Sequence, residues 1–405
     1  MVNVFSRLRA YFTGFGSTFL VLWSVMFLAI FAISMCDPAL PYLVRDFLVE
    51  EATVVAIVGY LHSAFRLSST AVSFPAGILS DRIGKRKVIL ASLCLSPVPF
   101  LLYFFSKNCC WLFAAALILG AFHGLSNPPF NALVADTAPK TSRAKAFAVF
   151  NLSWMLSGIP APIIGGFLSD TFNIRLPFIA AFILSVAALL LFLKTFRGAK
   201  SKSAIKLIRP YGSKDCSKRY GTYTRALTLF CVVSLLLGFG DGVLMPIITA
   251  FLMFRLGTSV MEMGIAFSVA YGIAMALSQI PGAKIADKFG KKPTILVGIL
   301  TATPLLALLP LTTSLIQFVV ILGLNSFIGY LWSPALSAWV AERIETDRRG
   351  KAYGFTSAAY GAGSIAGPAI GGILWMLFQP NTPLPFIIAM FPFFLIIPII
   401  TILKE

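Results

Sequence analysis

The same sixteen-residue pattern occurs twice in this chain, at an offset of slightly more than half of its 405 residues. Residues 75–90 read PAGILSDRIGKRKVIL, and residues 281–296, 206 positions later, read PGAKIADKFGKKPTIL. A second pair keeps this offset, because residues 143–166 (RAKAF…IPAPIIGG) match residues 349–372 (RGKAY…IAGPAIGG). Solenoid repeats recur about every 20–50 residues, so a period this long predicts two tandem copies of one domain.

Long apolar runs fill both copies. The chain is 58% hydrophobic and 12% charged, with a mean hydropathy of +0.88, whereas soluble domains carry about 25% charged residues. Runs of about 20 apolar residues can cross the roughly 30 Å hydrocarbon layer, and in lipid they must be helical to satisfy their own backbone. We predict an all-α membrane protein with twelve transmembrane helices in two six-helix bundles. The predicted spans are 19–43, 53–78, 88–106, 111–135, 147–168, 177–196, 226–253, 263–283, 294–313, 315–341, 353–378 and 385–403.

The positions of Lys and Arg orient the chain. With the N-terminus inside, the predicted cytoplasmic segments hold 28 of the 33 Lys and Arg, and the outer segments hold four. This asymmetry predicts a multi-pass protein of the cell membrane with both termini cytoplasmic. It also accounts for the net charge of +18 without nucleic acid. We expect bundles at 1–196 and 226–405, joined by a basic cytoplasmic linker at 197–225. We expect a monomer, no cofactor and no metal.

The repeated basic segment has the features of a gate. Gly77 would let the second helix approach a neighbour, Gly84 would allow a left-handed or tight turn, and Asp81 could bind a helix N-terminus or a cation. Such an ion pair could form in one conformation and break in another. Alternatively, the basic residues only anchor the topology. The gating candidates are Gly77, Asp81, Arg82, Gly84, Lys85 and Arg86, with Asp287, Gly290 and Lys291 in the second copy.

Residues 77–87 match the pattern G-x-L-[SA]-D-R-x-G-[RK]-[RK]-x, and with twelve helices in two copies the chain resembles the major facilitator superfamily. The resemblance implies solute transport by alternating access, with this loop stabilising the state closed to the cytoplasm. It also implies an Arg near the middle of the fourth helix in many members, where this chain has Gly120. Gly120 and Gly124 instead form a small-xxx-small pair that favours tight helix contact.

A second motif, G-x-x-x-G-P-x-x-G-G, is associated with antiporters of this family. The resemblance implies that this motif lies on the fifth helix, but here the complete copy lies on the eleventh helix and the fifth helix carries a weaker copy. The pattern gives a smooth helix face with a proline kink, on which one half could move against the other; ordinary packing is the alternative. The residues are Pro162, Gly165 and Gly166 on the fifth helix, and Gly363, Gly367, Pro368, Gly371 and Gly372 on the eleventh.

Three charged side chains lie within predicted spans: Asp37, Arg66 and Asp241. A charge at the bilayer centre costs at least about 2.5–3.5 kcal/mol, so each needs a partner, a water-filled cavity or a function. The two aspartates occupy near-equivalent places in the two copies, and His62 lies one turn from Arg66.

The resemblance implies that helices 1, 4, 7 and 10 line a central cavity, which would hold both aspartates. We expect Asp37 or Asp241 to take up and release a coupling proton, with Arg66 pairing with Asp37 in one state. His62 or His123 could assist, because histidine titrates near neutral pH. The alternatives are an Asp37 that reaches the outer headgroups, an Arg66 in a static ion pair, and histidines that only hydrogen-bond between helices.

Polar and aromatic residues recur on one face of two of these helices. The fourth carries His123, Asn127 and Asn131 at i, i+4 and i+8, and the tenth carries Asn325 and Trp332 seven residues apart. Aromatic walls with acidic groups suit a hydrophobic or cationic organic molecule. Trp332 could instead face lipid.

These features favour a proton-coupled exporter of small organic compounds. The alternative on the same scaffold is a symporter or uniporter that imports a sugar, an amino acid or an organic acid. A membrane sensor that signals through the basic linker is a third hypothesis. An enzyme is not expected, because the sequence lacks a nucleophile–base pair, a metal-ligand cluster and a phosphate-binding loop.

Overall fold

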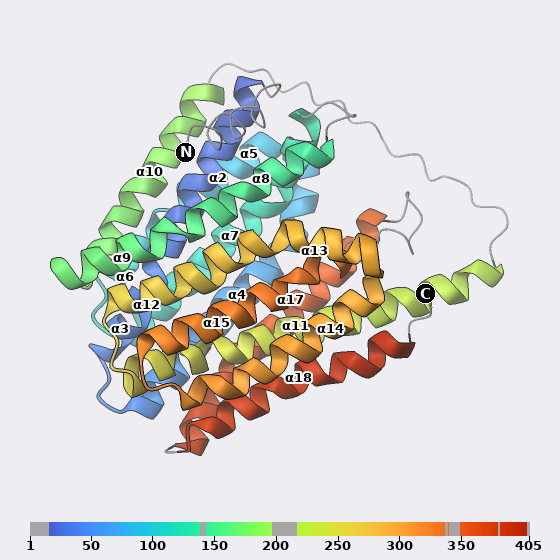
Figure 1. Ribbon diagram of the computed structural model, residues 1–405. Coiled ribbons are helices and arrows are strands. Elements are labelled where there is room, and N and C mark those ends of the chain that lie inside the picture. Colours follow the sequence, from blue (N-terminus) through green and yellow to red (C-terminus); the bar gives the residue numbers. More distant parts are fainter. Residues whose placement is uncertain are drawn as a thin grey trace, which may run out of the picture. The chain divides into compact units, whose positions relative to one another are not determined.

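The computed structural model of the chain describes residues 16–137, 143–196, 217–336, 339, 349–379 and 381–402. Every regular element within these residues is a helix, which confirms the predicted fold class (Figure 1). In chain order the elements are α2 (Ser17–Cys36), α3 (Ala39–Arg45), α4 (Glu51–Ile83), α5 (Lys85–Leu95), α6 (Val98–Phe104), α7 (Cys109–Thr137), α8 (Arg143–Gly158), α9 (Pro160–Thr171), α10 (Leu176–Phe196), α11 (Ser217–Ala250), η2 (Phe251–Arg255), α12 (Val260–Phe267), η3 (Ser268–Ala274), α13 (Met275–Phe289), α14 (Lys291–Leu305), η4 (Leu306–Leu311), α15 (Leu315–Leu331), α17 (Arg349–Phe378) and α18 (Pro383–Ile402).

In the described part of the chain, eleven helical stretches are long and apolar enough to cross a bilayer. They correspond to every predicted span except 53–78. That segment lies in α4, a continuous helix of 33 residues, so its length is sufficient and only its hydropathy is low. Arg66 and the polar run 68–70 lower the hydropathy of α4. A helix with this composition needs other helices around it, because lipid would not stabilise its polar side chains.

Proline interrupts the first span at a charged residue. The helix α2 ends at Asp37, its C-cap, and α3 begins after Pro38, its N-cap. Proline has no backbone N–H and its ring clashes with the preceding turn, so the helix bends here. The sequence Asp37-Pro38 therefore places a carboxylate at a break within a membrane-spanning segment.

The helices form two compact units. The first takes in the described residues of 1–49, 64–200 and 258–273, and the second those of 50–63, 201–257 and 274–405. Each unit thus combines helices of one repeat with a single helical segment of the other. The segment that joins the first unit is α12 with most of η3, and the segment that joins the second is the beginning of α4.

In the second unit, α17 packs along α11 through glycines of its motif. A Cβ atom on Gly363, Gly367 or Gly371 would overlap the backbone of α11, at Leu235, Phe239 and Val243 respectively. Small residues allow this approach, and close packing is a main source of stability between helices in lipid. The motif on α17 therefore forms the contact face between these two helices.

In the first unit, glycines of α7 pack against α4. A Cβ on Gly120 would meet the carbonyl oxygen of Phe65, and a Cβ on Gly124 would meet that of Ser69. The small-xxx-small pair thus permits the expected tight contact. At Gly77 a Cβ would meet no atom of the described chain within 4 Å, so the close approach expected there stays a prediction.

Candidate transport site

A polar and aromatic group surrounds His123 in the first unit. We call it the His123 cluster. Its members come from the break after α2, from α4, from α7 and from α8, and they are Asp37, Phe65, Arg66, Ser69, His123, Asn127 and Trp154. The cluster unites four of the site residues that the sequence predicts, namely Asp37, Arg66, His123 and Asn127.

Hydrogen bonds fix the imidazole of His123 between two helices. Its Nδ1 lies 2.9 Å from Oγ of Ser69 on α4. The Nδ2 of Asn127 lies 3.3 Å from its Nε2. The same Nδ2 lies 3.5 Å from Nδ1. An amide nitrogen can only donate, so a ring nitrogen of His123 accepts from Asn127, and either Nδ1 or the Ser69 hydroxyl is the donor in the contact between them, according to the tautomer. His123 and Asn127, the predicted i, i+4 pair on α7, are thus hydrogen-bonded to each other.

Aromatic rings enclose the imidazole. The Trp154 ring meets it edge-on, with centroids 5.6 Å apart and an interplanar angle of 86°, and the Phe65 ring lies at the same distance. Trp154 is 40% exposed, so much of its indole is open to a ligand or to lipid. An exposed indole beside polar groups provides a surface for flat or cationic organic molecules.

Arg66 connects the aromatic and acidic parts of the cluster. Its guanidinium lies 5.7 Å from the centroid of the Phe65 ring. It interacts electrostatically with both Asp37 and His123. Asp37 is half-buried at the helix break, and Arg66 is exposed. The two groups form no salt bridge within the described residues, so Arg66 acts on this carboxylate from a longer distance.

The second predicted carboxylate, Asp241, lies on α11 in the second unit. It is exposed, and its Oδ2 accepts a hydrogen bond of 3.0 Å from the Tyr360 hydroxyl on α17. Sequence reasoning missed Tyr360, because a single tyrosine among small residues carries no periodic signal. The pair shows that Asp241 has a partner different from that of Asp37.

The remaining predicted residues have other surroundings. Nδ2 of Asn325 donates to the carbonyl of Ala302 at 2.8 Å, and Trp332 packs, partly buried, against a cluster of apolar side chains in the second unit. Nδ1 of His62 lies 2.9 Å from the carbonyl of Val58 on its own helix. Asn131 is exposed. Their roles in a cavity stay predictions.

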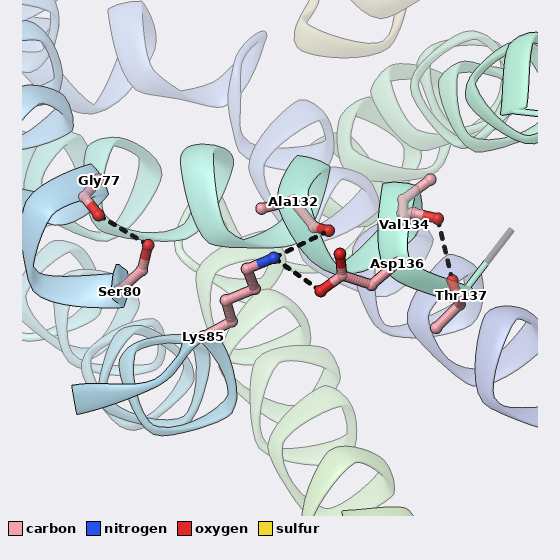
Figure 2. Close-up of polar contacts among 7 residues, drawn as sticks. All are labelled: Gly77, Ser80, Lys85, Ala132, Val134, Asp136 and Thr137. Carbon is pink, nitrogen blue, oxygen red and sulfur yellow. Dashed lines mark hydrogen bonds and ion pairs between the residues drawn. The ribbon is translucent and has the colours of Figure 1, made fainter. Parts of the chain in front are cut away.

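The basic segment after α4 contacts the end of α7 (Figure 2). Nζ of Lys85 lies 2.6 Å from Oδ2 of Asp136 and 3.4 Å from the carbonyl oxygen of Ala132. Sequence reasoning missed Asp136, although the repeat contains a signal. Residues 134–136 (VAD) recur 206 positions later as 340–342 (VAE), and Lys85 recurs as Lys291. The later triplet lies outside the described residues.

The two glycines of the repeated segment adopt the conformation expected of Gly84. Its φ is 99°, and φ of Gly290 is 90°. Side chains other than glycine rarely adopt such values, so each glycine makes possible the turn that ends one helix and starts the next. Arg86 stacks on Phe196, with its guanidinium 4.8 Å from the ring centroid. Asp81 is exposed and makes no ion pair within the described part of the chain.

Comparison with known proteins identifies this architecture. The family model described as Major Facilitator Superfamily matches residues 22–225 and 230–404. The chain belongs to the major facilitator superfamily. It is a multi-pass membrane transporter of small-molecule solutes, and its curated relatives include drug-resistance transporters of this superfamily.

Two curated relatives illustrate the similarity. The tetracycline resistance protein, class C, of Escherichia coli is 26% identical over 344 residues, which cover 84% of each chain. Multidrug resistance protein 1 of Bacillus subtilis (strain 168) is 24% identical, with 92% of each chain covered. A solved D-xylose-proton symporter is 14% identical with a TM-score of 0.75, covering 96% of this chain and 98% of its own. At that identity the symporter shows the superfamily fold alone.

We predict that the Lys85–Asp136 pair contributes to the conformational equilibrium of this superfamily transporter. Lys85→Asp and Asp136→Lys should each lower the initial rate of solute transport severalfold, because each places like charges side by side. The double exchange Lys85→Asp/Asp136→Lys should recover most of the rate. Since exposed pairs contribute at most about 1 kcal/mol, the thermal stability of all three variants should stay near that of the wild type. A double variant as slow as the single ones would contradict this role.

Proposed function

We propose that this transporter exports hydrophobic or cationic organic molecules in exchange for protons. The observation that carries the proposal is the His123 cluster, in which Arg66 interacts electrostatically with Asp37 and with His123, and the exposed indole of Trp154 meets the His123 ring edge-on. An acidic group can hold either a proton or a cationic solute, and an aromatic wall can bind the apolar part of that solute.

In the proposed cycle, Asp37 is the group for which proton and solute compete. When neither the proton nor the solute is bound, Arg66 stabilises the ionised form of the Asp37 carboxylate, since the two groups interact electrostatically. Arrival of a proton neutralises Asp37 and frees Arg66 to interact with His123 and solvent. Binding of the solute displaces the proton, so that the two cross the membrane in opposite directions.

The drug-resistance names of the relatives support export rather than import. The runner-up is a proton-coupled importer or a uniporter of a sugar, amino acid or organic acid. One observation favours it: the antiporter-associated motif is complete on α17, in the eleventh span, and weaker on α9, in the fifth.

Orientation and assembly belong to the same proposal. The excess of Lys and Arg in 82–87 and 284–292 supports placing these segments in the cytoplasm of a cell membrane protein. We also propose that residues 1–196 and 226–405 act as two halves joined by the linker 197–225, in a monomer.

Uptake of a probe into proteoliposomes tests the proposal. Ethidium is the cationic probe, and tetracycline is a second organic solute. Membrane potential is clamped with potassium and valinomycin, so that only the pH gradient drives transport. Vesicles that are acidic inside should accumulate probe, because outward proton movement drives inward probe movement in an antiporter. Accumulation only in vesicles acidified outside would instead show symport. Equal rates under both gradients would exclude proton coupling.

A further inference from the structure

Three cations lie where α5 packs against α10 in the first unit. The guanidinium of Arg86, in the first turn of α5, lies 4.8 Å from the ring centroid of Phe196, the last residue of α10. Lys87 follows Arg86, and Lys194 lies two residues before Phe196. Both lysines are exposed, and neither forms a salt bridge within the described residues. We call Arg86, Lys87 and Lys194 the α5–α10 basic cluster.

The start of α5 favours a bound anion. Its first turn holds Lys85, Arg86 and Lys87 and no acidic residue. The N-terminus of a helix carries a partial positive charge, so cations there are disfavoured and an anion is stabilised. Asp136 supplies one negative charge, because it pairs with Lys85 at 2.6 Å. A second anion at this helix start would offset the remaining repulsion.

Each lysine of the cluster ends an exposed apolar stripe on its helix. Residues four and seven positions apart lie on one face of a helix. The exposed residues at these distances from Lys87 on α5 and from Lys194 on α10 are Ala91, Cys94, Leu190 and Ala187. Exposed apolar side chains of a membrane-spanning helix face lipid, and a lysine at the end of such a stripe reaches the headgroup region. The cluster therefore lies where lipid acyl chains meet their headgroups.

The second repeat has no lysine at the equivalent positions. The offset of 206 residues makes Pro293 the counterpart of Lys87. The sequence LPFI at the start of α10 recurs 208 residues later in α18, so Ile402 is the counterpart of Lys194. A positive charge at both places is thus not a requirement of the shared fold.

The counterpart of Arg86 has a structural contact instead. It is Lys292, and its Nζ lies 2.9 Å from the carbonyl oxygen of Thr401 at the end of α18. A cation that binds the last carbonyl groups of a helix stabilises that helix end. Arg86 faces an aromatic ring in the same region of its own repeat, and this ring packs on Phe192 with centroids 4.6 Å apart.

The lipid-facing side chains also differ between the repeats. In the first repeat three exposed positions of the stripes carry short side chains, and in the second repeat their counterparts are bulkier and also exposed. The pairs are Ala91 and Val297, Cys94 and Leu300, and Ala187 and Leu395. Short side chains allow an acyl chain to lie closer to the helix backbone, where it gains dispersion contacts.

We propose that the α5–α10 basic cluster and the two stripes bind one anionic phospholipid, with the phosphate at the cations and the acyl chains along α5 and α10. A guanidinium binds phosphate oxygens through paired hydrogen bonds, and lysine ammonium groups attract them as point charges. Basic sites between membrane-spanning helices are a form of headgroup recognition. Membrane orientation alone would account for the cations but not for the short side chains below them.

Native mass spectrometry of the full-length protein in detergent tests this site. The probes are phosphatidylglycerol and phosphatidylcholine with identical acyl chains, and the measured quantity is the dissociation constant of the first bound lipid. The wild type should bind phosphatidylglycerol more tightly. Lys87→Gln/Lys194→Gln should weaken that binding at least about tenfold, because each lysine near a headgroup contributes about 1 kcal/mol, and should leave phosphatidylcholine binding unchanged.

The matched control is Lys284→Gln/Lys288→Gln, which removes two exposed lysines from α13 in the second basic segment. It makes the same change in net charge and should bind phosphatidylglycerol like the wild type. Equal weakening by the two double variants would overturn the proposal, because it would show attraction to the overall positive charge.

Two further measurements test the position of the acyl chains. Ala91→Leu/Ala187→Leu gives the stripes side chains as bulky as those of the second repeat and leaves every charge in place. It should weaken the binding of both lipids severalfold, and unchanged binding would contradict the proposed site. Glycerol 3-phosphate, which has a phosphate but no acyl chain, should not displace the lipid; displacement would show a site for free phosphate instead. No solute or pH gradient is used, so these results stand whether or not the protein exports ethidium.

Discussion

Asp37→Asn is expected to reduce proton-driven ethidium accumulation to about a tenth of the wild-type rate or less, while exchange of ethidium across the membrane without a gradient continues. The carboxamide has nearly the same shape but cannot take up a proton. A tenfold change corresponds to only about 1.4 kcal/mol, which is small beside the cost of a charge in the bilayer. Flux with and without a pH gradient separates coupling from carrier movement.

Two further variants make this result specific. Asp46→Asn makes the same chemical change at an exposed aspartate just after α3, outside the His123 cluster, and should leave both fluxes unchanged. Asp37→Glu keeps an ionisable group and should retain part of the coupling. Normal gradient-driven accumulation of ethidium by Asp37→Asn would show that this carboxylate does not couple proton and solute movement. Asp241 would then be the remaining candidate for the proton-binding carboxylate.

Gly371→Ala should have the largest effect on stability. Its Cβ would overlap the carbonyl of Val243 and lie 2.8 Å from Cγ of Pro246, so the α11–α17 contact would have to open. Overpacking of this kind costs about 1–3 kcal/mol, and here part of the obstacle is backbone that cannot rotate away. We expect a clearly lower midpoint of thermal unfolding in detergent and a lower yield.

Gly354→Ala is the matched control on the same helix. Nothing lies within 4 Å of a Cβ there, so the substitution adds no contact within the described chain. Alanine is favoured over glycine in a helix by about 0.5–1 kcal/mol, and the midpoint should stay the same or rise slightly. Equal midpoints for the two variants would show that the glycine face of α17 is not a packing requirement.

Properties set by local composition could be predicted from the sequence. Apolar runs predict helices because the bilayer requires each segment to satisfy its own backbone. The turn at Gly84 follows from a glycine between two helices, and its φ of 99° agrees. The low hydropathy of α4 has a structural counterpart, because Ser63 and Ser69 both form hydrogen bonds to other helices.

Contacts between distant helices could not be read from local patterns. Tyr360 meets Asp241 across 119 positions, and Asp170 meets Met261 across 91. A residue at such a contact is a single polar side chain whose neighbour depends on how the helices pack. Comparison of the repeats would have found part of this information, since residues 134–136 (VAD), which include Asp136, recur as residues 340–342 (VAE). The expected approach at Gly77 is not seen within the described chain, because a glycine shows where contact is possible and not where it occurs.

A measurement of proton movement together with solute movement shows directly whether Asp37 exchanges a proton for a solute. Vesicles with a pH-sensitive dye inside, an acidic lumen and a clamped membrane potential report proton loss when ethidium is added outside. We predict that ethidium accelerates alkalinisation of the lumen for the wild type and not for Asp37→Asn. Proton loss that ignores ethidium, or that responds equally in both proteins, would contradict exchange of a proton for a solute at the His123 cluster.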